Sequence, residues 1–257
     1  MLQEAHQHTI NNIVNKKQVI EIKSLCKSFG NNHVLKNFDL TLSEGESVAV
    51  LGKSGSGKSV LIKCIIGLMT PDSGNLKVFD KSIPELNQDE LDDMRIKIGF
   101  LFQSNALYDS MTVRENLEFP LRRHWVEKDK QKVDHLVIEA LDNVGLKHAI
   151  DMMPSELSGG MRKRISIART LILKPNIILY DEPTTGLDPI TGREISNLMI
   201  DVQKKYNTSS LIISHDMNCV KIAANRVIML IDGKNYAEGT YEELQKSKDS
   251  RISQFFE

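Results

Sequence analysis

The residues best suited to chemistry form one glycine-rich stretch, which lies between two apolar runs. Its spacing is Gly52, four further residues, and then Gly57, Lys58 and Ser59. Such a stretch lets main-chain N–H groups surround a phosphate, because glycine has no side chain to block the approach. Lys58 can then reach the β- and γ-phosphate oxygens, Ser59 can ligate Mg²⁺, and the following helix turns its positive end toward the anion. We therefore predict a nucleoside triphosphate site with contacts from Gly52, Lys53, Ser54, Gly55, Ser56, Gly57, Lys58, Ser59 and Val60.

Further candidate residues stand where continuously apolar runs of strand length end. They are Gln103 and the adjacent acids Asp181 and Glu182. Such runs are typical of buried parallel strands, and α/β sheets bind ligands at the carboxyl ends of these strands. We predict that Asp181 holds Mg²⁺ and that Glu182 orients the attacking water or accepts its proton. The two acids cannot share a role, because adjacent strand residues face opposite ways.

Two residues have both a functional and a structural interpretation. His215 ends a third apolar run, at the same predicted sheet edge as Gln103 and Glu182. This position favours a γ-phosphate contact, although a lone histidine is more often structural. Phe29 precedes the turn signal at residues 30–32, and its ring is either part of the core or a platform that stacks on a nucleobase.

A helix with an unusual first turn is predicted after Ser158. Gly159 and Gly160 follow the serine, and then come three consecutive cations at 162–164. Helix N-termini favour acidic residues, so this arrangement suits an anion that arrives from outside the chain. The alternative is that these cations are solvated or paired with Glu156.

The composition gives no global field that would attract nucleic acid or an anionic membrane. The 257 residues include 33 lysines and arginines and 34 acids, for a formal charge of -1. Three widely spaced cysteines fit reduced thiols in the cytosol. The apolar runs are too short to span a bilayer, and the polar N-terminus lacks a signal-peptide core. We therefore expect a cytosolic chain.

The chain pattern predicts one α/β domain at residues 18–244. Residues 19–22 and 38–42 predict an antiparallel ribbon, and the apolar runs predict a buried parallel sheet. The polar stretch 1–17 predicts a flexible N-terminal tail, and residues 245–257 predict a short C-terminal tail.

Helical patterns dominate residues 104–174 and predict an inserted α-helical subdomain. Thr112 and Glu115 have the spacing of a capping box, and an apolar stripe before Gly145 marks a second helix. Residues 106–121 mix large apolar side chains with few charges. This segment fits local core and a docking surface for a partner equally well.

The order of these motifs resembles the ATPase subunit of an ABC transporter, over about residues 19–244. The matching motifs are Walker A at 52–59, the Q-loop Gln103, the signature at 157–161, the Walker B acids Asp181 and Glu182, the D-loop at 186–188, the switch His215 and the A-loop Phe29. Met161 departs from the commonest signature, which has glutamine there. This departure does not threaten nucleotide binding, because serine and the glycine main chain make the phosphate contacts.

The resemblance implies an α/β P-loop NTPase fold: a mixed sheet core, an antiparallel β subdomain and an inserted α-helical subdomain. It also implies ATP and Mg²⁺ as cofactors. The implied catalytic residues are Lys58, Gln103, Glu182 and His215, the metal ligands are Ser59, Gln103 and Asp181, and further nucleotide contacts are Phe29, Ser158, Gly159, Gly160 and Asp188. Two copies would sandwich two ATP molecules head to tail, because the signature of one completes the Walker A site of the other. Separate chains would form the permease.

Finer features resemble the ATPases of Mla-type systems, which move phospholipids or other lipids with MCE-domain substrate-binding proteins. These features are Met161 and the stretches 102–108, 116–121 and 188–190. Two alternatives stay open: an amino-acid or other small-solute importer, and a soluble ABC ATPase of iron-sulfur cluster assembly. The transport interpretation places the chain on the cytoplasmic face of the inner or plasma membrane, bound to the permease, with no nucleic-acid partner.

Overall fold

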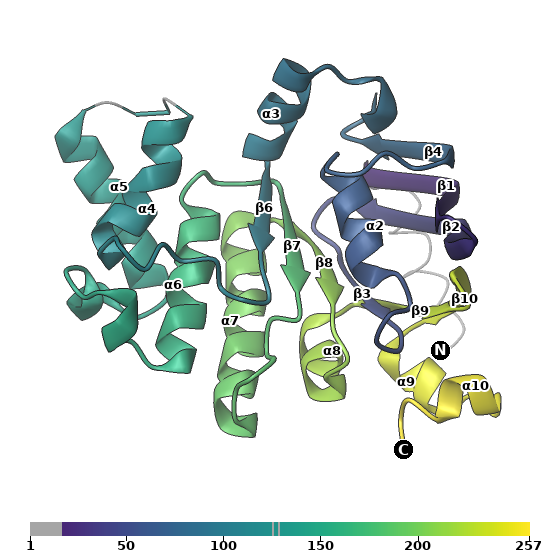
Figure 1. The fold of residues 1–257 in the computed structure, drawn as a ribbon. Helices are drawn as coiled ribbons and strands as arrows, with labels where there is room; N and C mark the ends of the chain where they lie inside the picture. Colours follow the sequence, from purple (N-terminus) through teal and green to yellow (C-terminus); the bar gives the residue numbers. More distant parts are fainter. Residues whose placement is uncertain (1–16, 125, 128) are drawn as a thin grey trace.

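The computed structural model describes residues 17–124, 126, 127 and 129–257, so all but the last residue of the tail predicted at 1–17 lies outside the described residues. An initial β-hairpin is followed by a mixture of strands and helices (Figure 1). In chain order the elements are β1 (Gln18–Phe29), β2 (Asn32–Ser43), β3 (Ser47–Leu51), α2 (Lys58–Ile65), β4 (Ser73–Val78), β5 (Lys81–Ser82), η1 (Ile83–Glu85), α3 (Gln88–Ile96), β6 (Ile98–Leu101), α4 (Val113–Arg123), α5 (Lys130–Asn143), η2 (Lys147–Ala149), η3 (Pro154–Glu156), α6 (Gly159–Leu171), β7 (Ile177–Asp181), α7 (Pro189–Tyr206), β8 (Ser209–Ile213), α8 (Met217–Ala223), β9 (Arg226–Ile231), β10 (Lys234–Gly239), α9 (Tyr241–Gln245) and α10 (Ser250–Ser253).

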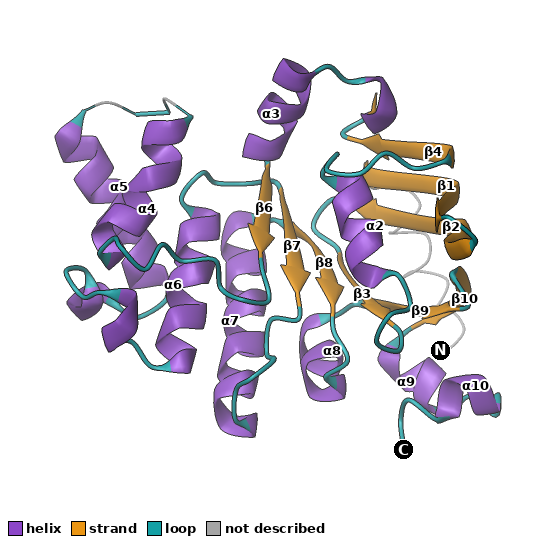
Figure 2. Ribbon diagram, in the orientation of Figure 1, coloured by secondary structure: helices purple, strands orange, loops and turns teal. Residues whose placement is uncertain are grey.

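Two sheets organise the described residues (Figure 2). The smaller sheet is antiparallel and has the order β2-β1-β4-β5. The larger sheet has the order β10-β9-β3-β8-β7-β6, in which β10 pairs antiparallel with β9 and the other pairs are parallel. The predicted α/β class with a mixed sheet core and an antiparallel β part is confirmed.

The larger sheet separates two apolar cores. On β3, Val48 and Val50 join the core formed with β1, β2 and α2, whereas Ala49 and Leu51 join the core formed with helices α4 to α8. Successive strand residues point to opposite faces, so a strand covered on both faces must be apolar throughout. Because both faces are buried, the parallel strands appear in the sequence as continuous apolar runs.

Strand β6 is shorter and less buried than its sequence predicts. A buried strand is expected over residues 98–102, but β6 ends at Leu101 and Phe102 is 42% exposed. The expectation is wrong at this end because β6 is the edge strand and pairs with β7 alone among the described strands. The Phe102 ring instead stacks on Phe100, with 4.0 Å between ring centroids.

Helices α4 and α5 lie to the left of the larger sheet in Figure 1, and α6 stands between them and α7. The capping box of Thr112 and Glu115 is present at the start of α4. In the segment 106–121, Val113 and Leu117 are core residues, whereas Tyr108 is 40% exposed and stacks on Phe119. The segment therefore supplies both core and surface, and the boundaries of a helical subdomain stay a prediction.

The C-terminal residues are docked onto the domain. Ile252 on α10 is buried, Phe256 packs edge-on against Tyr241, and Arg251 forms an ion pair with Asp232 in the β9–β10 turn. The three cysteines are free thiols. Within the described part of the chain, no helix has the length and apolar character needed to cross a bilayer.

Candidate nucleotide site

The glycine-rich stretch forms the loop between β3 and α2, and close main-chain contacts require its glycines. Gly57 caps α2 with a φ of 108°, in the left-handed region that favours glycine. A Cβ on Gly52 would lie 2.7 Å from the main-chain oxygen of Leu230 on β9. Neither position has room for a side chain, so the curvature of the loop depends on glycine.

Lys58 is buried inside this loop. Its Nζ donates to the main-chain oxygens of Gly52, at 2.7 Å, and Lys53, at 3.1 Å. Burial lowers the pKa of Lys58, and the negative charge of Glu182 opposes that shift. Nearby, Ser56 Oγ is buried with no hydrogen-bond partner among the described residues. A buried cation and an unpartnered hydroxyl in a glycine cradle fit a phosphate group.

A cavity of about 670 Å³ opens beside the loop and is called the catalytic cavity below. It is lined by the predicted residues Lys58, Ser59, Gln103, Asp181, Glu182 and His215. They come from the start of α2 and from the carboxyl ends of β6, β7 and β8, which are neighbours in the sheet. The structure therefore brings these residues together, while their chemical roles stay predictions.

Glu182 and His215 form a direct pair in this cavity. His215 Nδ1 lies 2.8 Å from Glu182 Oε2, and the same carboxylate oxygen accepts from the main-chain N of His215 at 3.3 Å. Thr185 Oγ1 lies 3.4 Å from that oxygen as well. The Glu182 side chain is only 12% exposed, whereas that of His215 is 68% exposed. One carboxylate is thus held in place by two chain segments, and the histidine ring faces the open cavity.

Both acids line the catalytic cavity, so the expectation that strand alternation turns them in opposite directions is wrong. Strand β7 ends at Asp181, and Glu182 has a φ of 50°, which is rare for a residue with a side chain. The turn, not strand alternation, therefore sets the direction of Glu182. Strained backbone of this kind is concentrated at functional sites.

Asp181 has the surroundings of a residue that receives a cation. Burial raises the pKa of its carboxyl, the charge of Glu182 adds to the rise, and Lys58 opposes it. No cluster of three or more His, Cys, Asp or Glu side chains suited to a metal occurs among the described residues. The predicted set of Ser59, Gln103 and Asp181 supplies one carboxylate and two neutral oxygens. Such a set suits Mg²⁺ that shares its other positions with phosphate oxygens and water.

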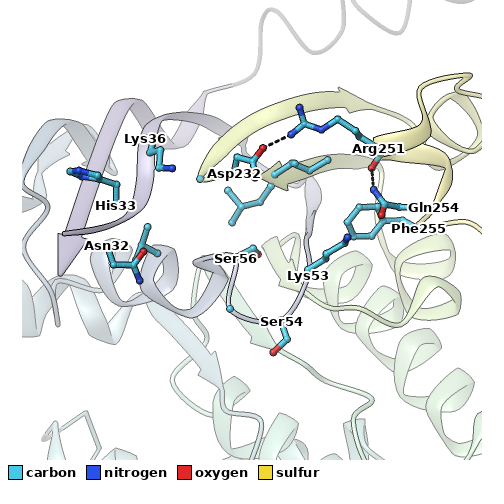
Figure 3. A pocket seen from close by; sticks show the side chains of 15 residues that line it. Asn32, His33, Lys36, Lys53, Ser54, Ser56, Asp232, Arg251, Gln254 and Phe255 are labelled. Atoms are coloured by element: carbon cyan, nitrogen blue, oxygen red, sulfur yellow. Dashed lines mark hydrogen bonds and ion pairs between the residues drawn. The ribbon is translucent and has the colours of Figure 1, made fainter. Parts of the chain in front are cut away.

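A second cavity, of about 540 Å³, also borders the loop and is called the C-terminal cavity below (Figure 3). Lys53, Ser54 and Gly55 line both cavities, and so does Phe255. The remaining walls come from the start of β2, the β9–β10 turn and α10, with the side chains of His33, Lys36, Asp232, Arg251 and Gln254. The sequence analysis missed these residues, because no motif links segments so far apart.

Phe29 lies away from both cavities. It ends β1, is 49% exposed, and is not among the residues that line either cavity in the described part of the chain. The Lys27 ammonium sits 5.7 Å from the centre of its ring. The exposure excludes the core interpretation of this ring, and the stacking role stays a prediction.

The signature residues form a separate cluster outside the catalytic cavity. Ser158 caps α6 by accepting from the N of Met161 at 3.2 Å, and Asp188 caps α7 in the same way through the N of Thr191 at 3.1 Å. A Cβ on Gly160 would lie 2.7 Å from the methyl group of Thr191, so the two helix starts adjoin each other. Neither cap residue lines the catalytic cavity. This cluster cannot complete that cavity within one described chain.

The interpretation of the first-turn cations as an anion site is wrong. Lys163 is 1% exposed and donates to the Gln103 main-chain oxygen, while Arg164 pairs with Glu194 at 2.9 Å. Arg162 donates to the main-chain oxygen of Leu157. Among the described residues, Glu156 forms no ion pair with these cations, and its carboxylate accepts from the N of Met153. All three cations make contacts within the chain. Only Ser158 and the main-chain N–H groups of the glycines are then left to bind an anion.

Comparison with known proteins gives a family and several relatives. A family model described as ABC transporter matches residues 35–185. The chain is 37% identical over 239 residues to the intermembrane phospholipid transport system ATP-binding protein MlaF of Haemophilus influenzae, with 93% of this chain and 90% of the relative covered. It is 38% identical to the methionine import ATP-binding protein MetN of Clostridium tetani, with 93% and 74% covered. It is 37% identical to the chloroplastic protein TRIGALACTOSYLDIACYLGLYCEROL 3 of Arabidopsis thaliana, with 92% and 73% covered.

Solved structures agree with this result. The dimeric ATP-binding cassette MJ0796 in a post-hydrolysis state with ADP and Pi has a TM-score of 0.77 and 33% identity, with 86% of this chain and 98% of that chain covered. The cbiO1 protein of Clostridium perfringens, part of the cbiONQ transporter complex, has a TM-score of 0.83 and 28% identity, with 91% and 93% covered. The glycine cradle, the acids at the end of β7 and these matches all indicate one conclusion: the chain is an ATPase and belongs to the ABC transporter family.

Proposed function

We propose that this chain is the ATPase of a lipid transporter whose permease consists of separate chains. The support comes from the relatives whose names describe phospholipid transport or a glycolipid, and from Met161 and the stretches 102–108, 116–121 and 188–190, which resemble Mla-type ATPases. An MCE-domain protein is the substrate-binding partner that this resemblance implies. The chain then acts at the cytoplasmic face of the membrane, where it is bound to the permease.

Import of an amino acid or another small solute is the second candidate. The methionine import relative has 38% identity, which is as high as that of the lipid-related proteins. The catalytic cavity is compatible with both candidates, because the transported substrate does not enter it. The partner proteins therefore distinguish them.

The pair Glu182–His215 is the observation that carries the catalytic proposal. In the proposed hydrolysis, a water oxygen bonds to the γ-phosphorus, the bond to the β,γ-bridging oxygen breaks, and ADP leaves. Glu182 takes the proton of that water, and its position is held by its contacts with His215 and Thr185. The exposed ring of His215 contacts the γ-phosphate.

Binding divides between the two cavities. Lys58 and the loop N–H groups hold the β- and γ-phosphates in the catalytic cavity, and the shared wall of Lys53, Ser54 and Gly55 leads to the C-terminal cavity for the nucleoside. Ser59, Gln103 and Asp181 hold Mg²⁺, which supplies positive charge to the phosphate oxygens during hydrolysis.

A second copy completes the site in this proposal. Ser158 and Asp188 lie outside the catalytic cavity of their own chain, so the partner's signature cluster would cover it in a head-to-tail dimer. Ser158→Arg would place bulk where the γ-phosphate docks and should abolish turnover, while binding of ATP by a single subunit stays nearly intact. Ser158→Ala is the matched control, since it also removes the helix cap but adds no bulk. Normal hydrolysis by Ser158→Arg would contradict the head-to-tail site.

Co-purification from detergent-solubilised membranes tests the transport proposal. We expect a multi-pass permease and an MCE-domain protein to accompany the chain. The complex in proteoliposomes should then move a fluorescent phospholipid only with ATP, and Glu182→Gln should stop this transfer. A permease found with a small-solute binding protein would establish the importer instead. Recovery with soluble iron-sulfur assembly factors and no permease would overturn the transporter class.

A further inference from the structure

Three side chains on one face of α6 bind the loop that carries Gln103. Lys163 Nζ donates to the main-chain oxygen of Gln103 at 3.1 Å. Ser166 Oγ lies 2.9 Å from the main-chain oxygen of Asn105 and 2.8 Å from that of Arg162, so its one proton is shared between these two acceptors. Arg169 Nη1 donates to the main-chain oxygen of Ala106. The donors are three residues apart, a spacing that places them on one side of a helix. We call Lys163, Ser166 and Arg169 the donor row.

Two of the three residues of the donor row are buried, and Arg169 is half-buried. Lys163 is 1% exposed and Ser166 is 3% exposed, although both carry polar groups. Buried polar groups are costly unless they are paired, and pairing through a cation gives the stronger hydrogen bonds. The charge of Lys163 also acts on Asp181 in the catalytic cavity. Lys163 is therefore close enough to Asp181 for its charge to act on this predicted metal ligand.

The loop conformation needs such external support. Asn105 and Ala106 have φ values of 65° and 52°. Left-handed backbone is unfavourable for a residue with a Cβ, most clearly for alanine, whose side chain has no polar group to compensate. Main-chain preferences alone would not keep residues 105 and 106 in this shape. The bonds from Ser166 and Arg169 reach the carbonyl groups of these same residues.

The next part of the loop is fastened to a different helix. Asn116 on α4 is fully buried, and its amide donates to the main-chain oxygens of Tyr108, at 3.1 Å, and Met111, at 3.0 Å. Its Oδ1 accepts from the N of Tyr108 at 2.8 Å. Residues 103–106 are thus held by hydrogen bonds from α6, while residues 108–111 are held by hydrogen bonds from α4. The position of Gln103 is tied to the helix that Ser158 caps.

We propose that the donor row is a positioning device for ATP hydrolysis: it fixes Gln103 relative to the signature helix α6, so that catalysis through Gln103 depends on Lys163, Ser166 and Arg169. This inference rests on the role proposed above for Gln103. None of the three side chains lines the catalytic cavity, so they act through the loop and not on the substrate. A purely structural role would instead support the fold of α6 without affecting Gln103 selectively.

A double-mutant cycle in the full-length chain separates the two roles. Lys163→Met keeps the length and apolar volume of the side chain but removes the ammonium group. We expect kcat to fall about tenfold, the loss typical of one hydrogen bond to a charged group, with KM for MgATP unchanged. In a Gln103→Ala background the same change should cost less than about twofold, because residues that act as a unit are not additive.

Amide hydrogen exchange measures how firmly the loop that carries Gln103 is held. Lys163→Met should speed amide exchange in a peptide covering residues 102–107 and leave the Walker A peptide unchanged, because only the loop loses its support. Arg164→Met is the matched control: it removes a cation from the same helix, but its partners are Val144 and Glu194. It should alter neither the loop exchange nor kcat. If Lys163→Met does not fold, Ser166→Ala takes its place in every measurement.

The outcomes distinguish this inference from the proposed function. Unchanged loop exchange, or equal fold losses in both backgrounds, would overturn the donor row while leaving Gln103 in its role. Wild-type turnover by Gln103→Ala would overturn both the role of Gln103 and the positioning device. A fall in melting temperature with an unchanged kcat per folded molecule would show that the row is structural only.

Discussion

The two cavities beside the glycine-rich loop are built in different ways. The catalytic cavity takes its chemistry from residues at the ends of neighbouring parallel strands, such as Glu182 after β7 and His215 after β8. The C-terminal cavity is assembled from β2, the β9–β10 turn and α10, with Arg251 and Phe255 from the last residues of the chain. The geometry of the parallel sheet brings the residues of the catalytic cavity together. The residues of the C-terminal cavity come together only when the C-terminal segment docks onto the domain.

This difference predicts unequal sensitivity to substitution. In the catalytic cavity, Lys58 is buried and Glu182 is paired with His215, and all three side chains line one cavity, so each change should remove a specific step. In the C-terminal cavity, walls come from exposed or half-buried side chains on separate segments. Changes there should alter affinity slightly and leave the chemical step intact. The following variants test this contrast, from the largest expected effect to the smallest.

Glu182→Gln should have the largest effect. It keeps the shape of the side chain and removes its charge and basicity, and a positioned general base contributes about 10²–10⁴-fold in rate. ATP binding should survive, because Lys58, Ser59 and Asp181 are unchanged, so the variant should accumulate as an ATP-bound dimer. Steady-state turnover and size exclusion with ATP measure the two effects. Turnover near that of the wild type would remove Glu182 from the catalytic role.

Lys58→Ala should come next and should act on binding. Hydrogen bonds to charged groups contribute about 1.5–3 kcal/mol, so we expect ATP affinity to fall about 10- to 100-fold. Equilibrium titration with a fluorescent ATP analogue measures this loss. Wild-type affinity in Lys58→Ala would exclude this loop as the phosphate site.

His215→Ala should slow turnover by about tenfold, through the loss of one γ-phosphate contact and of the Glu182 partner. The side chain is 68% exposed. The melting temperature should therefore stay within about 2 °C of the wild type, as for other exposed substitutions in a domain of this size. A large drop in melting temperature with activity lost in proportion would identify a structural histidine instead.

Phe29→Ala and Phe255→Ala should have the smallest effects. The lower end of the energy for stacking on a base is about 1 kcal/mol, which corresponds to roughly a fivefold loss of ATP affinity. Each change should raise KM and leave kcat unchanged, in contrast to Glu182→Gln. Comparing the two variants shows which ring meets the base: an effect of Phe255→Ala alone would remove Phe29 from the nucleotide site. A fall in kcat in either variant would break the contrast between the cavities.

Much of the catalytic cavity could be predicted because its signals are local. Strands β7 and β8 are buried on both faces, so they are continuously apolar, and the polar residues at their ends stand out. The capping box of α4 is likewise contained within four consecutive residues. The prediction failed where burial depends on distant neighbours. Phe102 looks like part of a buried strand, but an edge strand leaves it exposed.

The sequence by itself determined the glycine-rich loop, the buried parallel strands and the residues at the strand ends. Local spacing specifies these features, because glycine geometry and double burial restrict residue choice position by position. Only the tertiary structure decided the role of Lys163, which looks like an exposed cation at a helix start but is buried against the Gln103 loop. It likewise decided the left-handed turn at Glu182 and the docking of Phe255 beside the loop. These features depend on which distant segments pack together, and no local pattern of residues encodes that choice.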